Sequence, residues 1–468
     1  MNTGTKTTAA NKIAIEEEWM NRPKPMLPMY DFSSTPESVN LLKGAVEVCL
    51  DSNCLTGTAE LQLQFLPTPR LVFHANLQGK TSPPFIFAIN DSVESSLSFN
   101  GQIIKGFYGY HSSDLSSDTW KLDWYPEFEP VTLSIMHTKN SVAAIFHLFN
   151  FPDFHGGQHQ DTAPAACSLL VLASEEWKIS IQALPDGATR DAWIRIKTEG
   201  GSFLTHMVKL ERNDGKLFSG EEASEQSHLL DYFLSFVTGG RCSPSCGVGI
   251  DLAGEITWRT FNSPRTSTPP YSWFTPNIGS QAERLFPLFV KRWNQSDEWK
   301  KCLRAAIYWY VQANTRGRSP SIDASIILAQ AALERLAHHY IMVDSQIISK
   351  TKFKNLKAAG RLRMLCTHFC IPGDITNAVP DIKSAVTRLK NKATWQDGPH
   401  AITDIRNSLT HPDNKFDLSD CYVDAWKLSL WYLELSVLAL CDYDGTYTNR
   451  LTATYTFDSE VVPWKLKV

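Results

Sequence analysis

The chain has 468 residues, a net charge of −4 and a hydrophobic content of 43%. This length allows two to four domains, each with its own core, and the composition is that of an ordinary globular protein rather than a disordered or fibrous one. Because the net charge is small, any nucleic-acid-binding surface must come from a local concentration of cations. The ten cysteines are scattered along the chain, which favours a reducing compartment over a disulfide scaffold.

The sequence gives no sign of a signal peptide or a membrane span. Residues 1–19 are polar and lack the apolar core of a signal peptide. The longest apolar helical run, 422–440, carries Asp424, Lys427 and Glu434, which excludes a membrane-spanning helix. We therefore expect a cytoplasmic protein with no membrane partner.

From about residue 40 to 215 the pattern predicts β-strands separated by prolines and glycines. The runs 85–89 and 143–149 are continuously apolar and suit inner strands. Many short strands with turn signals predict a sandwich or barrel-like domain, which we assign to residues 1–223. Strands are also predicted where apolar and polar residues alternate, at Leu61, Leu63 and Phe65, at Leu133 and Ile135, at Ile179 and Ile181, and at Ile194 and Ile196.

Residues 224–280 are predicted to form a helix followed by a connecting segment. The helix has apolar residues from Leu229 to Val237, and Gly239 and Gly240 end it. The next stretch, 241–277, is rich in Ser, Pro, Thr and Gly, and its run 263–270 is typical of an exposed linker.

Residues 281–468 are predicted to form an α-helical bundle. Ser296 is placed to cap a helix with an acidic first turn. A second helix begins at Ser319-Pro320 and has apolar residues at steps of three or four. A third contains 401–411, and the last runs through 422–440. At least four amphipathic helices make a bundle, so the predicted fold is a multidomain α+β protein.

The segment Arg406-Asn407-Ser408-Leu409-Thr410-His411 carries the most informative chemistry. Asn407 and His411 lie four residues apart, so on a helix the amide could orient the imidazole. Pro412 disfavours helical geometry at His411, so we expect the helix to end there. The helix dipole favours a protonated histidine, whereas the Arg406 guanidinium opposes it. A histidine poised near neutrality beside a fixed cation suits acid–base chemistry on a phosphodiester.

A concentration of cations precedes this segment. In a chain of net charge −4 it fits either the footprint of an RNA backbone or a solvated helix face. Glu334, in the middle of a predicted helix, could support the Arg406 segment or could be an ordinary ion-pair partner. The predicted RNA-binding residues are Lys350, Lys352, Lys354, Lys357, Arg361, Arg363, Arg388, Lys390 and Lys392.

We predict no metal site and no cofactor. The sequence has neither a phosphate-binding glycine loop nor a nucleophile elbow. Three clusters contain metal-ligating residue types, but each lacks a complete ligand set. They are Cys242 with Cys246, His155 with His159, and Cys366 with His368 and Cys370.

The segment from Arg406 to His411 resembles the R-x4-6-H signature of the HEPN superfamily, with a polar residue directly after the arginine. Within that superfamily, residues 285–468 resemble the ApeA-type abortive-infection proteins, and the β-rich half does so only loosely. The runs that carry this second resemblance are 306–310, 332–337, 449–451 and 462–464.

The resemblance implies a metal-independent endoribonuclease whose composite cleft forms across a homodimer or a higher homo-oligomer. His411 would act as general acid or base, Arg406 would hold the scissile phosphate, and Asn407 would orient either. Cleavage would leave a 2′,3′-cyclic phosphate, and transfer RNA cut in its anticodon loop is the expected substrate.

The implied biology is anti-phage defence, in which a phage-encoded protein releases the nuclease through the N-terminal sensor domain. One alternative is a non-catalytic HEPN scaffold that binds RNA or only dimerises. The other is an antitoxin-type partner that masks a separate toxin.

Overall fold

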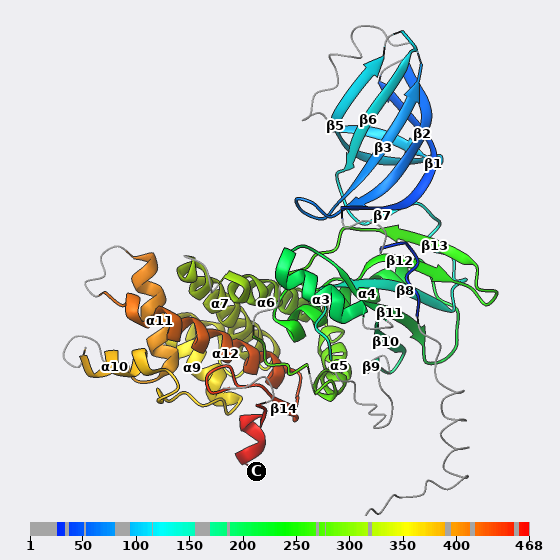
Figure 1. Ribbon diagram of the computed structural model, residues 1–468. Helices are drawn as coiled ribbons and strands as arrows, with labels where there is room; N and C mark the ends of the chain where they lie inside the picture. The colour runs from blue at the N-terminus through cyan, green and yellow to red at the C-terminus, as the bar shows by residue number, and fades with distance from the viewer. Residues whose placement is uncertain are drawn as a thin grey trace, which may run out of the picture.

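The computed structural model describes residues 26–32, 37–50, 53–79, 94–114, 116–154, 169–184, 188–267, 271–276, 278–316, 321–388, 395–411, 417–453 and 458–467. Along the chain it forms a β-barrel, a seven-stranded sheet and a helical bundle (Figure 1). This confirms the predicted α+β layout, with a β-rich N-terminal half and a helical C-terminal half. Among the described residues, no helix has the length and apolar character needed to cross a membrane.

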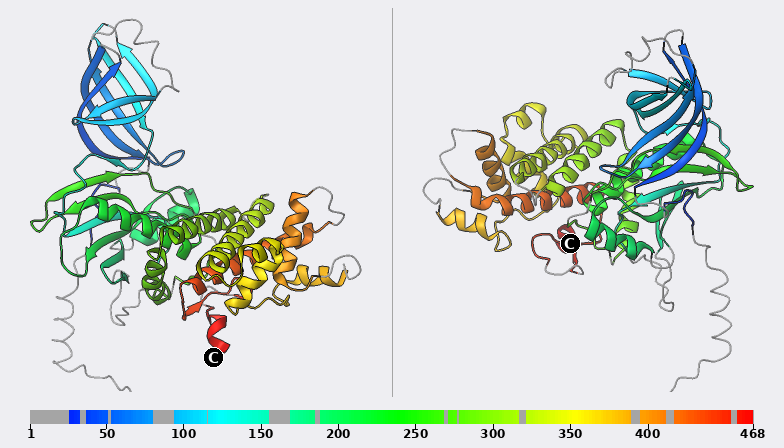
Figure 2. Two further views of the ribbon diagram at one scale, coloured as in Figure 1. Left: turned by 180° about the vertical axis from the view of Figure 1, so that it is seen from behind. Right: turned by 45° about the horizontal axis from the view of Figure 1, so that its top comes forward.

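The first β-structure is a closed barrel of six antiparallel strands in the order β1-β2-β3-β6-β5-β4. Alternate side chains on each strand point inwards, and Leu61, Phe73 and Trp124 are among those buried in its core. Figure 2 shows the barrel standing on the seven-stranded sheet. Its strands are β1 (Ser38–Leu50), β2 (Asn53–Gln64), β3 (Arg70–Gln78), β4 (Glu94–Phe99), β5 (Gln102–Asp114) and β6 (Thr119–Pro126).

A disulfide joins Cys49 in β1 to Cys54 in β2. This pair departs from the expectation drawn from the scattered cysteines. The antiparallel register of the two strands sets Cys49 directly opposite Cys54, a proximity that the linear spacing alone did not reveal.

The second β-structure has seven strands in the order β7-β13-β12-β8-β11-β10-β9. Its central strand β8 is buried along its whole length, as its continuous apolar run predicted. Ile145 and Phe149 share a core with the barrel, whereas Phe146 and Leu148 share a core with the helices. The strands are β7 (Val131–Thr132), β8 (Ala143–Phe149), β9 (Leu169–Ala173), β10 (Trp177–Ala183), β11 (Leu204–Arg212), β12 (Ser245–Ile250) and β13 (Ile256–Phe261).

The predicted connecting segment is wrong over residues 245–261, which form β12 and β13 inside this sheet. Glycines make the segment look like a loop, but here they leave room for aromatic rings. A Cβ added to Gly247 would lie 2.5 Å from the Phe146 ring, and one added to Gly249 would lie 2.1 Å from Trp258 Nε1.

Two predicted strands near the sheet are also wrong. The segment with Ile194 and Ile196 forms helix α3 (Ala188–Glu199), in which Ile196 is buried and Ile194 is 51% exposed. On a strand, residues two positions apart would share a face, whereas on a helix they lie on nearly opposite sides, as these two isoleucines do. Two apolar residues alone were too few to distinguish the two periods in the sequence. Leu133 and Ile135 follow the two-residue β7 and lie outside any strand. The predicted inner strand at 85–89 lies outside the described residues.

Helix α4 (Gly220–Thr238) joins the sheet to the bundle. Ser219 and Glu222 form a capping box at its start, and Gly239 ends it with a φ of +73°, as predicted. At α6, Ser296 accepts a hydrogen bond from the Trp299 amide at 3.1 Å, which confirms the predicted cap. The bundle contains α5 (Ser280–Trp293), α6 (Asp297–Arg316), α7 (Ile322–Ala337), the π-helix η1 (His338–Asp344), α8 (Lys350–Asn355), α9 (Ala358–His368), α10 (Pro380–Arg388), α11 (Gly398–Thr410), η2 (Ser419–Cys421) and α12 (Tyr422–Leu440).

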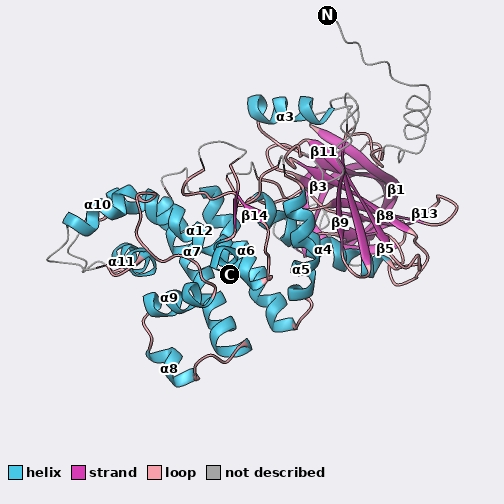
Figure 3. Cartoon of the chain, turned by 90° about the horizontal axis from the view of Figure 1, so that it is seen from below, coloured by secondary structure: helices cyan, strands magenta, loops and turns pink. Residues whose placement is uncertain are grey.

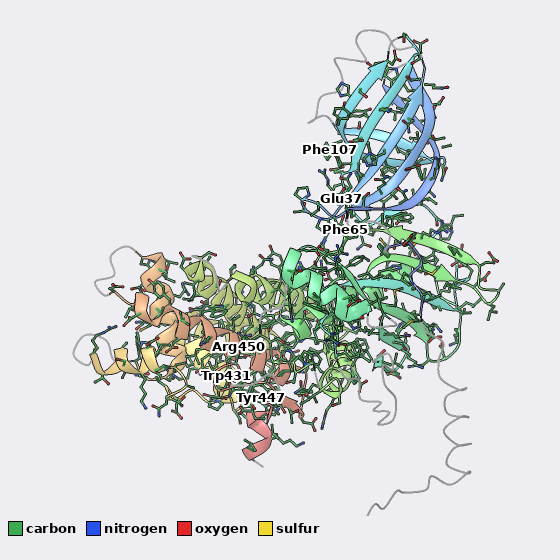
Figure 4. The ribbon with its side chains drawn as sticks, viewed as in Figure 1. Glu37, Phe65, Phe107, Trp431, Tyr447 and Arg450 are labelled. Carbon is green, nitrogen blue, oxygen red and sulfur yellow. A yellow bond between two sulfur atoms is a disulfide. The ribbon has the colours of Figure 1, made fainter. Side chains whose placement is uncertain are left out.

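The C-terminal tail folds back on the bundle, as predicted. It contains β14 (Thr446–Tyr447), which pairs with β15 (Glu460–Val461), and the short helix η3 (Pro463–Lys467). Trp431 of α12 donates to the Tyr447 hydroxyl at 3.3 Å (both labelled in Figure 4).

A buried ion pair lies at the junction between this tail and the sheet half of the molecule. Glu434 and Arg450 have side chains that are 1% and 4% exposed, and Arg450 Nε donates to Glu434 Oε2 at 2.8 Å. Arg450 also donates to the Tyr271 carbonyl, and Asn314 donates to the Gly239 carbonyl at 2.9 Å. These contacts connect α6, α12 and the tail to the segments that follow α4 and β13.

Candidate functional site

The site predicted from the sequence lies at the end of α11. Asp397 caps the helix by accepting from the His400 amide at 2.9 Å. Ile402 and Ile405 are buried and hold α11 in the bundle core. The helix stops at Thr410, which confirms the predicted end.

His411 leaves the helix in an extended conformation, with φ −119° and ψ 111°. Its amide still donates to the Asn407 carbonyl at 2.9 Å, so the backbone of Asn407 anchors the turn. Within the described part of the chain, no hydrogen bond joins the Asn407 side chain to the imidazole, so orientation of His411 by that amide stays a prediction. The His411 residue is exposed.

Arg406 is held from α7. Its Nη2 donates to Glu334 Oε1 at 2.7 Å, and the two side chains are 23% and 27% exposed. The buried Gln330, one turn earlier on α7, donates to Thr403 of α11 at 3.2 Å and supports the packing of the two helices. Arg361 Nη1 approaches the other Glu334 oxygen at 3.9 Å. One carboxylate thus lies between two guanidinium groups, and this trio carries an excess positive charge.

Sequence reasoning missed His338, which follows Glu334 by one helical turn at the start of the π-helix η1. Its ring packs edge-on against Phe353 at 5.5 Å. Partial burial lowers the pKa of His338, and the charges of Arg361, Arg335 and Lys350 lower it further. The four-residue spacing from Glu334 was a usable signal, and π-helical turns often occur at functional sites.

The lysines of α8 face solvent. Lys350, Lys352 and Lys354 are exposed, as is Lys357 at the start of α9, and no ion pair occupies them among the described residues. In Figure 3 the helix α9 lies between α8 and α11. The structure therefore brings this predicted basic segment to the same end of the bundle as Arg406.

Arg361 connects the two groups of cations. Its guanidinium stacks on Phe353 at 4.9 Å and donates to the Phe353 carbonyl at 3.3 Å, while its Nη1 faces Glu334. Two other predicted arginines have carboxylate partners instead: Arg363 pairs with Asp397, and Arg388 pairs with Asp420 at 2.6 Å. Lys390 and Lys392 lie outside the described residues.

The cysteine and histidine clusters form no metal centre within the described part of the chain. The one group of three close ligand atoms there is Glu47, Cys49 and Cys54, and its two sulfurs are joined in the disulfide. Burial raises the pKa of the Cys242 and Cys246 thiols, which disfavours the thiolates that a metal needs. His155 and His159 lie outside the described residues.

Two family models match the chain. Residues 137–272 match the YopA central domain, and residues 296–461 match the YopA C-terminal domain. Over 465 residues the chain is 28% identical to an uncharacterized SPbeta prophage-derived protein, YopA, of Bacillus subtilis (strain 168). The aligned region covers 97% of this chain and 99% of that protein. No solved structure matches the chain.

The two matches follow the architecture. The YopA central-domain match contains β8 to β13 and α4, and the YopA C-terminal match contains α6 to α12 with Glu334, His338, Arg406 and His411. The barrel lies outside both matches. These descriptions name no activity.

Proposed function

We propose that the chain is a metal-independent endoribonuclease of the HEPN type, with Arg406 and His411 as catalytic residues and no cofactor. One observation carries the proposal: the Arg406 guanidinium is held by Glu334 at the end of α11, five residues before an exposed histidine. The surplus of positive charge from Arg361 and the α8 lysines would favour an RNA backbone at this end of the bundle.

The residues suit cleavage by internal transfer. Arg406 uses Nη2 for Glu334, so other N–H groups of its planar fork can hold the scissile phosphate. His411 would take the proton of the ribose 2′-hydroxyl, O2′ would attack phosphorus, and the bond to O5′ would break. His411 of a second copy would return a proton to O5′, giving a 2′,3′-cyclic phosphate and a 5′-hydroxyl. DNA, which lacks the 2′-hydroxyl, would be inert.

The proposed setting is defence against phage, with transfer RNA cut in its anticodon loop as the substrate. The prophage origin in the name of the Bacillus relative supports a place in conflicts between phages and hosts. The β-rich half would restrain the nuclease in the cytoplasm until a phage-encoded protein binds it. The shared core between sheet and bundle would transmit that event.

A second candidate is a non-catalytic HEPN scaffold that binds RNA or dimerises. The surroundings of His411 favour it, because no hydrogen bond joins the Asn407 side chain to the imidazole in the described part of the chain and the exposed ring is left without that support. In this function, the α8 lysines and Arg361 would bind RNA, and His411 would be dispensable.

The test uses purified full-length chain with total transfer RNA in EDTA, and maps the ends of the products. We expect cuts with cyclic-phosphate ends that disappear in Arg406→Ala and in His411→Ala. His400→Ala, on the same helix, is the matched control and should keep the activity. RNA binding without any cut, both with the pure protein and in phage-infected lysate, would favour the scaffold instead.

A further inference from the structure

A second cationic surface lies where α4 and its following segment meet α6. Figure 1 shows α4 beside the sheet and α11 at the other end of the bundle, so this surface is separate from the Arg406 site. Partial burial lowers the pKa of His228 here, and the positive charges of Arg304, Lys300, Arg241 and Arg265 lower it further. Four cations therefore lie close enough to His228 to affect its charge.

This charge is largely uncompensated. Asp231 pairs with Arg241 at 3.4 Å, and its side chain is only 14% exposed. Among the described residues, no ion pair involves Arg265, Lys300 or Arg304. In a chain of net charge −4, such a concentration of unpaired cations fits a polyanionic partner.

Tyrosine rings are interleaved with these cations. The Arg241 guanidinium lies 5.6 Å from the Tyr308 ring and 5.9 Å from the Tyr232 ring, and Arg304 lies 5.6 Å from Tyr232. Stacking on the tyrosine rings holds the guanidinium groups in place. The N–H groups at the edges of each guanidinium stay available to donate hydrogen bonds. Tyr308 is 45% exposed, so its ring also offers a surface on which a base can stack.

Three members of this surface follow one stripe of α6, where Arg304 and Tyr308 are exposed and Lys300 is half-buried. Lys300, Arg304 and Tyr308 are spaced by four residues, so they lie on one face and span about 12 Å. Single-stranded nucleic acids are bound by such combinations, in which cations follow the backbone and aromatic rings stack with bases. An acidic protein segment would need the cations alone and would leave the exposed tyrosine without a role.

We propose that this surface, the α4–α6 patch, is a docking site for single-stranded RNA. Its unpaired cations, Arg265, Lys300 and Arg304, contact backbone phosphates, and Tyr308 stacks with a base. That the bound polymer is RNA rests on the proposed function. That it is a single-stranded polyanion with bases rests on the cations and tyrosines of the patch. The patch consists of Tyr232, Arg241, Arg265, Lys300, Arg304 and Tyr308.

The test measures binding of a fluorescently labelled, unstructured RNA oligonucleotide by anisotropy, using the full-length His411→Ala chain so that cleavage does not interfere. In this background, Lys300→Gln with Arg304→Gln should weaken binding at least fivefold. Removing two phosphate contacts should also lower the slope of log Kd against log salt by about 1.4. Tyr308→Ala should weaken binding about fivefold or more with little change of slope, because stacking releases no counterions.

The matched control is Arg190→Gln with Lys197→Gln, which also removes one arginine and one lysine charge, here from the exposed face of α3. Figure 3 shows α3 apart from α4 and α6, so RNA binding should stay unchanged. Equal weakening in the control, or none in the patch variant, would overturn the proposal. Displacement of RNA by polyglutamate together with full binding by Tyr308→Ala would also overturn it, and would assign the patch to an acidic protein.

The outcome is separable from the proposed function. If the patch does not bind RNA, His411-dependent cleavage of transfer RNA is still expected. Failure of cleavage would leave RNA binding by the α4–α6 patch measurable in the same chain.

Discussion

Glu334 in α7 accepts a hydrogen bond from Arg406 in α11 at 2.7 Å, although the two residues are 72 positions apart in the chain. Arg361 approaches the same carboxylate at 3.9 Å from α9. Three helices thus meet at one acidic group, and Glu334 sets the position of the arginine on which the proposed chemistry depends. Because the pair is partly exposed, its contribution to the free energy of unfolding should be small. Its effect on the position of the Arg406 guanidinium should be the larger one.

Glu334→Gln tests this relationship. The amide keeps an oxygen acceptor but loses the charge that holds Arg406, so single-turnover RNA cleavage should fall at least tenfold. The free energy of unfolding should change by no more than about 1 kcal/mol, because exposed ion pairs contribute little. Glu60→Gln, which removes a surface pair with Lys43, should change neither quantity. Wild-type cleavage by Glu334→Gln would show that the pair has no positioning role.

Much of the bundle could be predicted from local signals. The cap at Ser296, the stop at Gly239 and the end of α11 before His411 each depend on residues within one turn of each other. The presence of Arg406 and His411 at one helix end was predictable for the same reason. The HEPN activity attached to them stays a prediction.

Contacts between distant segments could not be predicted in this way. The pairing of Glu334 with Arg406 depends on how α7 packs against α11, and no local pattern encodes that. Strands β12 and β13 were missed because Gly247 and Gly249 read as loop residues, whereas the rings of Phe146 and Trp258 fill the space above them. Closure of the barrel depends on strand order, which alternation within single strands does not specify.

The lysines of α8 should contribute to RNA binding, whereas Arg388 should not. Lys352 and Lys354 are exposed and have no ion-pair partner among the described residues, but Asp420 neutralises Arg388 at 2.6 Å. Lys352→Gln with Lys354→Gln should lower the slope of log Kd against log salt by about 1.4. Arg388→Gln should leave the slope unchanged. Anisotropy titrations with labelled transfer RNA at several salt concentrations measure these slopes. A similar slope change in both variants would indicate that RNA responds only to the overall charge of the protein.

The buried pair of Glu434 and Arg450 should dominate the stability of the junction. Glu434→Gln leaves the Arg450 charge buried without its partner, which costs about 3–5 kcal/mol. Replacing both residues together, Glu434→Leu with Arg450→Met, removes the unpaired charge and should be less destabilising than Glu434→Gln alone. Urea unfolding followed by tryptophan fluorescence measures both. A cost below about 1 kcal/mol for Glu434→Gln would mean that water reaches this pair.

Acid sensitivity should arise in part from His206 in the seven-stranded sheet. The residue is fully buried among Phe151 and Phe154, and neither ring nitrogen has a hydrogen-bond partner in the described part of the chain. Burial lowers its pKa from 6.5 to about 3. Between these values the unfolded chain binds a proton that the native chain does not, so the free energy of unfolding falls as the pH drops from about 6.5.

His206→Leu should therefore unfold at the same or a higher urea concentration than the wild type at pH 7.5, because leucine needs no hydrogen bond. Between pH 6.5 and 4.5 the variant should lose about 2–3 kcal/mol less than the wild type. His147→Leu is the informative comparison, since His147 accepts from the Met29 amide at 3.1 Å and its Nδ1 lies 3.1 Å from the Cys246 carbonyl. That variant should lose about 1–3 kcal/mol already at pH 7.5. An unaltered pH dependence in His206→Leu would mean that the native state accommodates the charged ring.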